Sequence, residues 1–371
     1  MMNRKPLRVM VVDDTVLYRK IVSDALATLP GVEVVGSAHN GKAAITKLTS
    51  LKPDLLTLDI EMPEMSGIEV LDHIQQHALH VGAIMLSTLT QEGGAMTMKA
   101  LELGAFDFIP KPQTGTMAEN RKKIESAIAP IIRAFQRSAR ISSILKPATG
   151  PRKKSPTSTV RNVSSRSPRT LDASFTRSKA KIIAIGISTG GPNALAKMLP
   201  MIPGDIGVPI VIVQHMPPMF TQSLANSLAS KCAISVREAK QGEPLLPNTA
   251  FIAPGGKQMK IVAGADGKNR IIKITDDPPE NSCKPSVDYL FRSVAHHYVG
   301  RSTGVIMTGM GSDGTQGLKL LKKNGATIIA QNEATCVVFG MPKEAAETGL
   351  ADAVLALNQI ADMIVKTVRV G

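Results

Sequence analysis

The sequence predicts two α/β domains, each a doubly wound parallel sheet, with an antiparallel β ribbon in the second. The chain has 371 residues, which is long enough for two cores of ordinary size. In both halves, short apolar runs alternate with segments of helical period, a pattern typical of parallel sheets covered by helices on both faces. A proline-punctuated basic segment separates the halves. We place the first domain at residues 1–138, a flexible linker at 139–179 and the second domain at 180–371.

The first half contains five apolar runs that are short enough to be strands of an open parallel sheet. The predicted strands are residues 7–12, 32–38, 55–60, 82–88 and 106–111, and the predicted helices are residues 15–29, 41–51, 66–78 and 94–104.

The second half repeats this alternation and adds a β insertion. The predicted strands are residues 181–188, 209–215, 303–309 and 326–332, and the predicted helices are residues 194–202, 220–232, 286–299 and 315–325. Residues 249–277 predict an antiparallel ribbon that turns at Asp266-Gly267.

The charge is concentrated in the linker. Residues 139–179 carry ten Lys or Arg and one acidic residue, so this segment holds +9 of the net charge of +14. Its Ser/Thr-rich composition buries too little apolar surface to fold alone, and the alternative is a segment that orders on a partner. Aromatic residues are only 3% of the chain, which leaves little material for base stacking, so we expect no nucleic-acid partner.

Targeting signals and cysteine patterns are weak in this chain. The three cysteines are too few and too scattered for a disulfide framework or a structural zinc site, so we expect free thiols. The N-terminal apolar run meets two aspartates before a signal-peptide core can form. No apolar run approaches the roughly 18 to 20 residues of a membrane span. We therefore expect a soluble, cytoplasmic protein.

Polar residues end several strands of the first half. Asp13 and Asp14 follow the first strand, Asp59 the third, Ser87 the fourth and Lys111 the fifth. Ligands of open parallel sheets bind at the carboxyl ends of the strands, and three converging carboxylates favour Mg²⁺. An aspartate beside this metal and a lysine is placed to accept a phosphoryl group. Taken singly, each carboxylate could instead be a surface group or a helix cap.

The motifs VVDD, LDIEMP, LST and FDFIPKP resemble those of response-regulator receiver domains over about 130 residues. The resemblance implies a flavodoxin-like fold with Asp59 as the phosphoacceptor. It implies that Mg²⁺ is bound by Asp13, Asp14, Asp59 and the backbone carbonyl of Glu61. It also implies that Ser87 and Lys111 contact the phosphate and that Phe108 is the mobile aromatic residue. Finally, it implies a cis peptide bond at Lys111-Pro112.

A turn of small residues follows the first strand of the second half. Its GISTGG sequence allows a dinucleotide-binding loop or a nucleophilic Ser188 between Gly186 and Gly190. The dinucleotide pattern requires glycine where Ser188 stands and an acidic residue at the end of the next strand, which here ends in Gln214-His215. Both departures favour the nucleophile.

A serine nucleophile needs a base, an orienting acid and an oxyanion hole. Of the seven histidines, His215 is predicted to end a strand that neighbours the serine's strand. Asp313, in the glycine-rich turn GMGSDG, is placed to orient the imidazole, or alternatively to cap the following helix. Backbone N–H groups of Thr189 and Met310 are candidates for the oxyanion hole. This half requires no cofactor or metal.

The motifs GISTGGPNAL, VIVQHMPPMF, FIAPGGKQM, KPSVDYLF, IMTGMGSDG and VVFGMPKEA are similar to those of the chemotaxis protein-glutamate methylesterases, the CheB family, across residues 180–371. The resemblance implies a Ser188–His215–Asp313 triad that hydrolyses glutamate methyl esters on methyl-accepting chemotaxis receptors and deamidates selected receptor glutamines. Two positions depart from the family: Gln258 replaces a frequent histidine, and Lys284 replaces a frequent arginine.

The order of receiver, linker and esterase predicts regulation by phosphorylation. If the unphosphorylated receiver covers the Ser188 cleft, phosphorylation of Asp59 exposes the site. The expected partners are the receptors and a chemotaxis histidine kinase as phosphodonor, with peripheral association of a monomer with membrane receptor arrays. Two rivals remain: a response regulator whose output domain only binds DNA or protein, and a receiver-controlled nucleotide-dependent oxidoreductase.

Overall fold

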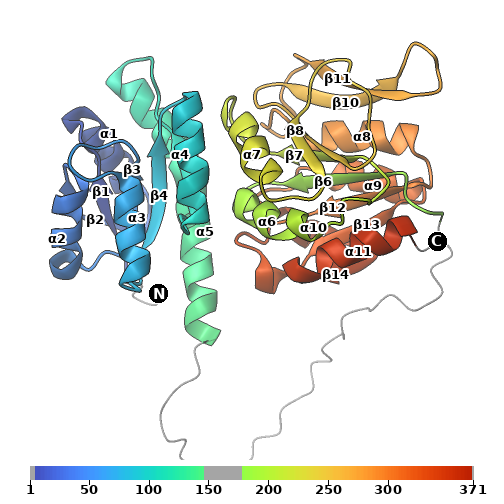
Figure 1. The fold of residues 1–371 in the computed structure, drawn as a ribbon. Helices are drawn as coiled ribbons and strands as arrows, with labels where there is room; N and C mark the ends of the chain where they lie inside the picture. Colours follow the sequence, from blue (N-terminus) through green and yellow to red (C-terminus); the bar gives the residue numbers. More distant parts are fainter. Residues whose placement is uncertain (1–4, 146–177, 370–371) are drawn as a thin grey trace, which may run out of the picture.

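The computed structural model describes residues 5–145 and 178–369, which form two α/β domains that lie side by side (Figure 1). Most of the predicted linker, residues 146–177, lies outside the described residues. None of the helices in the described ranges combines the length and apolar character that crossing a bilayer requires.

The first domain is built on a parallel sheet with strand order β2-β1-β3-β4-β5. Helices α1 and α5 pack together on one face, while α2, α3 and α4 cover the other. Its strands are β1 (Leu7–Val12), β2 (Val32–Ala38), β3 (Leu55–Asp59), β4 (Gly82–Ser87) and β5 (Asp107–Pro110). Its helices are α1 (Val16–Ala27), α2 (Gly41–Leu51), α3 (Gly67–Gln76), α4 (Gln91–Glu102) and α5 (Met117–Leu145). The order 2-1-3-4-5 places β1 and β3 together at the centre of the sheet, so the acidic residues that follow them converge.

Local sequence fixes where several of these helices begin. Ser66 accepts from the Glu69 amide while the Glu69 carboxylate accepts from the Ser66 amide, a capping box that starts α3. Asn40 caps α2 and Thr90 caps α4, each by a single hydrogen bond that its side chain accepts from a backbone amide. Helix α5 continues to Leu145, past the boundary we placed at residue 138.

The second domain is built on a parallel sheet of order β14-β13-β12-β6-β7-β9-β8. One face carries α6, α7 and α11, and the other carries α8, α9, α10 and the ribbon. The strands are β6 (Ile182–Ile187), β7 (Ile210–Gln214), β8 (Ser235–Glu238), β9 (Thr249–Ile252), β12 (Ser302–Ile306), β13 (Thr327–Gln331) and β14 (Ala353–Leu355). The helices are α6 (Gly191–Met198), α7 (Phe220–Ala229), α8 (Val287–His297), α9 (Thr315–Lys323), α10 (Met341–Glu347) and α11 (Leu357–Arg369).

The predicted ribbon is correct only in its second part. Strands β10 (Gln258–Ala263) and β11 (Arg270–Thr275) pair antiparallel around the turn at Asp266-Gly267. Strand β9, which we assigned to the ribbon, instead joins the main sheet in parallel between β7 and β8. All four of its residues are buried, and complete burial is typical of an inner parallel strand rather than of an exposed ribbon.

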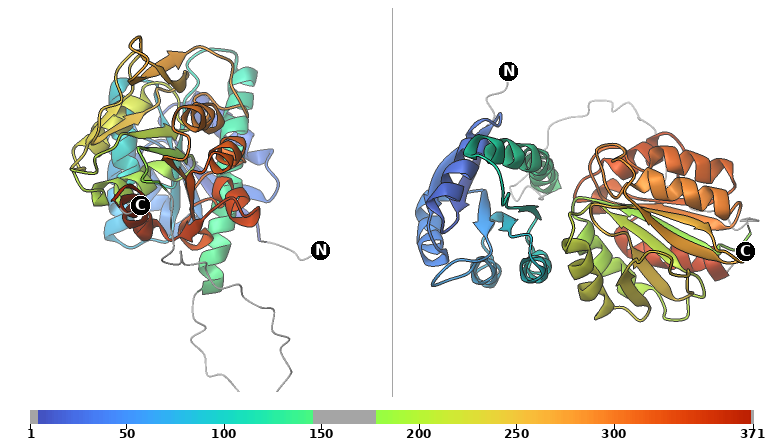
Figure 2. Two further views of the ribbon diagram at one scale, coloured as in Figure 1. Left: turned by 90° about the vertical axis from the view of Figure 1, so that its right-hand side faces the viewer. Right: turned by 90° about the horizontal axis from the view of Figure 1, so that it is seen from above.

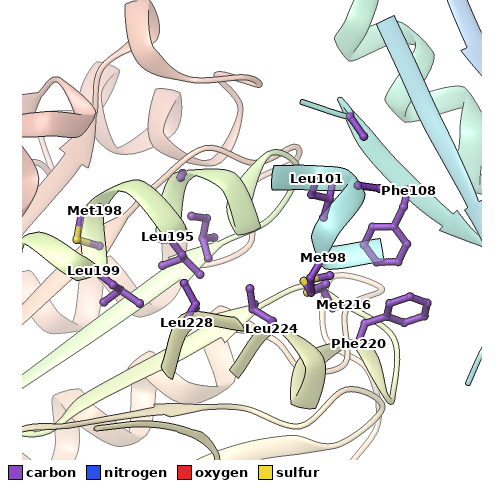
Figure 3. Packing of buried hydrophobic residues seen from close by; sticks show 14 of the residues in the cluster. Met98, Leu101, Phe108, Leu195, Met198, Leu199, Met216, Phe220, Leu224 and Leu228 are labelled. Atoms are coloured by element: carbon purple, nitrogen blue, oxygen red, sulfur yellow. The ribbon is translucent and has the colours of Figure 1, made fainter. Parts of the chain in front are cut away.

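The two domains share one hydrophobic cluster. Met98 and Leu101 of α4 and Phe108 of β5 pack on the α6 and α7 side of the second domain (Figure 3). Their partners include Met216, Phe220, Leu224 and Leu228. The view from above shows the α4 edge of the first domain turned toward the second (Figure 2). The receiver-like domain therefore contacts the helices that begin next to the candidate active site.

Candidate active site and acidic pocket

Ser188 lies on a tight turn between β6 and α6. It follows the last strand residue, Ile187, and Gly190 just beyond it has φ of +73°, a conformation that favours glycine. A Cβ on Gly190 would lie 2.6 Å from Val337, and one on Gly191 would lie 1.9 Å from Gln214 Oε1. Gly190 adopts a left-handed backbone conformation, and Gly191 leaves room for the Gln214 amide, so the predicted small-residue turn is confirmed.

His215 lies beside Ser188 because of strand register. Strands β6 and β7 pair in parallel with Ile187 opposite Gln214, so the next residues on the two strands are Ser188 and His215. The His215 amide donates to Ile187 O at 3.1 Å, which continues this pairing. Neighbouring strands lie about 4.8 Å apart, so nucleophile and base leave the sheet side by side.

Asp313 comes from the loop after β12, the strand on the other side of β6. His215 Nε2 donates to Asp313 Oδ2 at 2.8 Å. The same carboxylate accepts from the Val287 and Asp288 amides at 2.7 and 3.1 Å, which are the first amides of α8. Asp313 therefore bonds both His215 and the first two amides of α8, the helix whose N-cap is Ser286. The cap of α9 considered from sequence is wrong, since Gly314 is the N-cap there.

The charge states of the pair follow from this network. Burial raises the pKa of Asp313, but the His215 hydrogen bond and charge and the Val287 amide outweigh burial and lower it to about 2. Burial lowers the pKa of His215, yet its bonds to Asp313 and Cys283 raise it to about 9. The structure thus describes an ionised aspartate holding a basic histidine.

Two backbone N–H groups near Ser188 are available for an oxyanion. Among the described residues, no acceptor is within hydrogen-bond reach of the amides of Thr189 or Met310. Gly309, which precedes Met310, lies so near the serine that a Cβ there would be 2.7 Å from Ser188 Cβ. Both predicted donors therefore lie on the two turns that flank the nucleophile.

Gln214 connects the two catalytic strands, a role that the sequence did not predict. Its Nε2 donates to Ser188 O at 3.0 Å and to His215 O at 3.2 Å, while its Oε1 is buried without a partner. The amide therefore fixes the backbone of nucleophile and base relative to each other. The only sequence signal was its position directly before His215.

The segment from residue 276 to 286 supplies the other residues that sequence reasoning missed. Asn281 Nδ2 and Ser286 Oγ each donate to Asp313 Oδ1 at 2.9 Å. Cys283 Sγ lies 3.7 Å from His215 Nδ1. This segment is irregular between β11 and α8, so no hydrophobic period could mark these residues.

Gln258 and Lys284, the two residues that depart from the family pattern, bind the backbone of residues 276–286. Gln258 is fully buried, donates to Pro278 O at 3.0 Å and accepts from the Ser286 amide at 2.9 Å. Lys284 Nζ donates to Asp276 O at 3.0 Å as a single point charge. Neither residue contacts the triad directly.

In the first domain, Lys111 joins two of the predicted carboxylates. Its Nζ lies 2.6 Å from Asp59 Oδ2 and 2.8 Å from Asp13 Oδ2. Burial raises the pKa of Asp59 to about 6 although Lys111 lowers it, and the neighbouring Asp13 and Asp14 carboxylates add to the rise. The pKa of Lys111 is itself raised, because its two carboxylate partners outweigh its burial.

The acidic pocket fits a magnesium ion. Asp13, Asp14 and Asp59 each offer a carboxylate oxygen, and these atoms lie within 4.8 Å of one another. Lys111 is the one cation paired with them among the described residues, so three negative charges face one positive charge. An all-oxygen donor set with excess negative charge suits a hard divalent cation.

Ser87 and Phe108 have partners other than Asp59. Ser87 Oγ donates to Gly93 O at 3.1 Å and accepts from Thr97 Oγ1 at 2.7 Å, both on α4. Phe108 is 8% exposed and packs on the second domain. Ser87 is thus held by α4, and Phe108 contacts the second domain directly.

The expected cis bond at Lys111-Pro112 is wrong. The cis peptide in the described chain is Lys284-Pro285, and Lys111-Pro112 is trans. The Lys111 amide donates to Ser87 O at 2.7 Å and Tyr18 Oη donates to Pro112 O, so the trans chain already has its polar partners.

Comparison with known proteins identifies the family of this chain. Residues 183–364 match the model of the CheB methylesterase, and residues 9–122 match that of the response regulator receiver domain. A protein-glutamate methylesterase/protein-glutamine glutaminase of Desulfotalea psychrophila is 58% identical over 98% of this chain and 99% of its own length. The chain belongs to the CheB methylesterase family.

Two further CheB relatives match all or part of this chain. A protein of the same name from Trichodesmium erythraeum is 42% identical over 98% of this chain and 99% of its own length. A crystal structure of the Thermotoga maritima CheB methylesterase catalytic domain is 40% identical, with TM-score 0.49, covering 51% of this chain and 99% of that chain. This chain spans nearly the whole length of the Desulfotalea and Trichodesmium relatives and contains both a receiver domain and a methylesterase domain.

Proposed function

We propose that Ser188, His215 and Asp313 are the triad with which this protein-glutamate methylesterase/protein-glutamine glutaminase hydrolyses its substrates. The observation that carries the proposal is the 2.8 Å bond from His215 Nε2 to Asp313, combined with the β6–β7 register that places Ser188 next to His215. The substrates are glutamate methyl esters on methyl-accepting chemotaxis receptors, and selected receptor glutamines for the second activity.

The reaction is acyl transfer through a covalent intermediate. Ser188 Oγ attacks the side-chain carbonyl carbon while the imidazole nitrogen not bonded to Asp313 takes the hydroxyl proton. The Thr189 and Met310 amides donate to the developing oxyanion. The imidazolium then protonates the leaving methoxide, or the leaving amine when the substrate is glutamine, and methanol or ammonia departs.

Water completes the cycle by the same groups. His215 takes a proton from a water molecule that attacks the acyl carbon, and then returns a proton to Ser188 Oγ as glutamate is released. Asp313 remains ionised throughout, because its low pKa and six hydrogen-bond donors stabilise the carboxylate. Its role is to keep the imidazole oriented and to stabilise the imidazolium.

The receiver domain controls this site through phosphorylation of Asp59. Asp13, Asp14, Asp59 and the backbone carbonyl of Glu61 would hold Mg²⁺, which when bound neutralises charge on the transferring phosphoryl group. Lys111 Nζ, already 2.6 Å from Asp59, would contact the phosphoryl oxygens. Ser87 would have to leave Gly93 O to reach them.

The domain contact supports release as the means of control. Met216 lies directly after His215 and is buried in the cluster shared with the receiver. Asn193, on the helix that follows Ser188, donates to Ala105 O of the receiver at 3.5 Å. Phosphorylation that draws Ser87 away from α4 and Phe108 away from Phe220 would weaken docking and free the approach to Ser188. A chemotaxis histidine kinase would supply the phosphoryl group.

The test is methanol release from methylated receptor membranes, with and without a small-molecule phosphodonor. Ser188→Ala should lower the rate by about 10⁴- to 10⁶-fold, as triad disruption does in serine hydrolases. Ser235→Ala, on the exposed end of edge strand β8, is the matched control and should retain the rate. Near-normal hydrolysis by Ser188→Ala would refute the triad. DNA binding without hydrolysis, or nucleotide-cofactor binding, would favour the two rival functions.

A further inference from the structure

The active site contains a thiol that the hydrolytic mechanism does not use. Cys283 Sγ lies 3.7 Å from His215 Nδ1 and 3.4 Å from Asn281 O, and its side chain is partly exposed. In the described chain, the site groups His215, Cys283 and Asp313 within the reach of one metal ion. Imidazole nitrogen and thiolate sulfur are the ligands that Zn²⁺ prefers.

We propose that His215 and Cys283 bind Zn²⁺ and that the bound ion reversibly inhibits the enzyme. Typical bonds are about 2.0 Å for Zn–N and about 2.3 Å for Zn–S, and a tetrahedral angle between them places the two ligand atoms about 3.5 Å apart. The observed Nδ1–Sγ separation is 3.7 Å. The pair can therefore bridge one ion with a shift of only a few tenths of an ångström. On binding, the thiol gives up its proton, and a protonated His215 also gives up its Nδ1 proton.

Asp313 acts as the outer partner of this site rather than as a third ligand. Its Oδ2 already accepts from His215 Nε2 and Val287 N, and its Oδ1 accepts from four further donors: Asn281 Nδ2, Ser286 Oγ, Asp288 N and Gly314 N. A metal-bound histidine usually donates its other N–H to a carboxylate, which fixes the ring and raises its basicity. Here that bond exists before any metal arrives, so the ring is preorganised.

Zinc inhibits catalysis in this proposal because it binds to Nδ1 of His215. The lone pair at Nδ1 is the one that must take the Ser188 proton, so coordination removes the general base. This inhibition rests on the proposed role of His215, whereas metal binding by the pair does not. Two protein ligands leave the remaining positions to water, so a chelator should strip the ion and restore activity.

The binding test uses Co²⁺ as a spectroscopic substitute in the full-length protein, with excess Mg²⁺ to fill the receiver carboxylates. Oxygen ligands give no thiolate-to-cobalt charge-transfer band, so the band reports a sulfur ligand. We expect the band in the wild type, in Cys232→Ser and in Ser188→Ala, and its loss in Cys283→Ser and Cys283→Ala. No band in the wild type, or an equal band in both Cys283 variants, overturns the proposal.

The inhibition test compares each protein with its own zinc-free rate. Zn²⁺ that displaces the cobalt band should lower wild-type methanol release by about 10²- to 10⁴-fold, the usual contribution of a general base. Cys232→Ser should be inhibited equally, and Cys283→Ser far less. Equal inhibition of Cys283→Ser and wild type overturns the zinc mechanism. The cobalt band reports metal binding and methanol release reports the esterase. Ser188→Ala should keep the band and lose hydrolysis, so failure of the metal site can be told apart from failure of the esterase assignment.

Discussion

Phe108 of the receiver domain packs against Phe220 of the catalytic domain, with ring centroids 4.5 Å apart and a tilt of 36°. Phe108 lies three residues before Lys111, which pairs with the phosphoacceptor candidate Asp59, and Phe220 begins α7, five residues after His215. One aromatic contact therefore connects the acidic pocket with the catalytic base across the domain boundary.

Phe108→Ala should raise the methylesterase activity of the unphosphorylated enzyme. An aromatic pair contributes about 0.5–1.5 kcal/mol beyond its buried area, so its loss shifts the docked-to-free ratio by roughly two- to tenfold. Methanol release without phosphodonor measures this. Glu102→Gln, which removes the carboxylate charge from the partly exposed ion pair with Lys231, should give a smaller increase that fades with added salt. Unchanged basal activity in both variants would contradict control by docking.

Esterase activity should rise with pH through the neutral range and level off above about 9. His215 has its pKa raised to about 9, so below that pH most of it is protonated and cannot accept the Ser188 proton. The pH profile of kcat/KM in a chelating buffer reports this group in the free enzyme. The Ser188→Ala protein supplies the blank for alkaline ester hydrolysis.

Cys283→Ala should move that profile to lower pH. Burial is the largest influence on the pKa of His215 and lowers it. The hydrogen bond to Asp313 raises the pKa, and the hydrogen bond and charge of Cys283 raise it further. Its removal leaves a larger neutral fraction of His215 at pH 7. A profile identical to the wild type would show that Cys283 does not interact with the base.

Asp313→Asn should lower kcat by about 10⁴-fold, because the wrong imidazole tautomer is then held toward Ser188. It should also destabilise the protein, since an ionised carboxylate at the N-terminus of α8 contributes about 0.3–2 kcal/mol. Asp288→Asn is the matched control: its buried carboxylate accepts from Gly317 N at 2.7 Å and does not contact His215. Urea unfolding should show a loss of stability in both variants, while kcat should fall steeply only in Asp313→Asn.

Gln214→Met should slow hydrolysis by about tenfold while leaving the fold intact. The change keeps the side-chain volume and removes the two donors to Ser188 O and His215 O, at about 1–1.5 kcal/mol of lost alignment. Circular dichroism should stay near wild type, and the urea midpoint should fall only modestly, because Nε2 loses two hydrogen bonds while Oε1 makes none in the described chain. A full-rate variant would show that strand register alone aligns the two residues.

The sequence predicted that Ser188, His215 and Asp313 lie at one edge of the sheet because each follows a strand of a parallel sheet. Once β6 and β7 are neighbours, the period of the strands brings Ser188 and His215 together without further information. The same reasoning placed Asp13, Asp59 and Lys111 at one edge. Convergence at strand ends is a property of topology, and topology follows from alternating apolar and helical segments.

Other parts of the site and fold had no periodic signal. Cys283, Asn281 and Ser286 reach Asp313 or His215 from an irregular segment whose path depends on tertiary contacts such as those of Gln258. Strand β9 is only four residues long and directly precedes the ribbon, so its pairing partner could not be told from composition. Met98 and Leu101 are apolar on α4 like core residues, and sequence cannot show that their partner is the other domain.

Chelation of Mg²⁺ should abolish activation by a small-molecule phosphodonor and leave basal hydrolysis unchanged. The three carboxylates of the acidic pocket face a single lysine, so without a divalent cation they repel an incoming phosphoryl group. The triad uses only side-chain and backbone groups of the catalytic domain, so basal methanol release has no such requirement. Asp59→Asn should reproduce the loss of activation with Mg²⁺ present. Loss of basal hydrolysis on chelation, with Asp59→Asn still activated by the phosphodonor, would place the metal requirement in the catalytic domain instead.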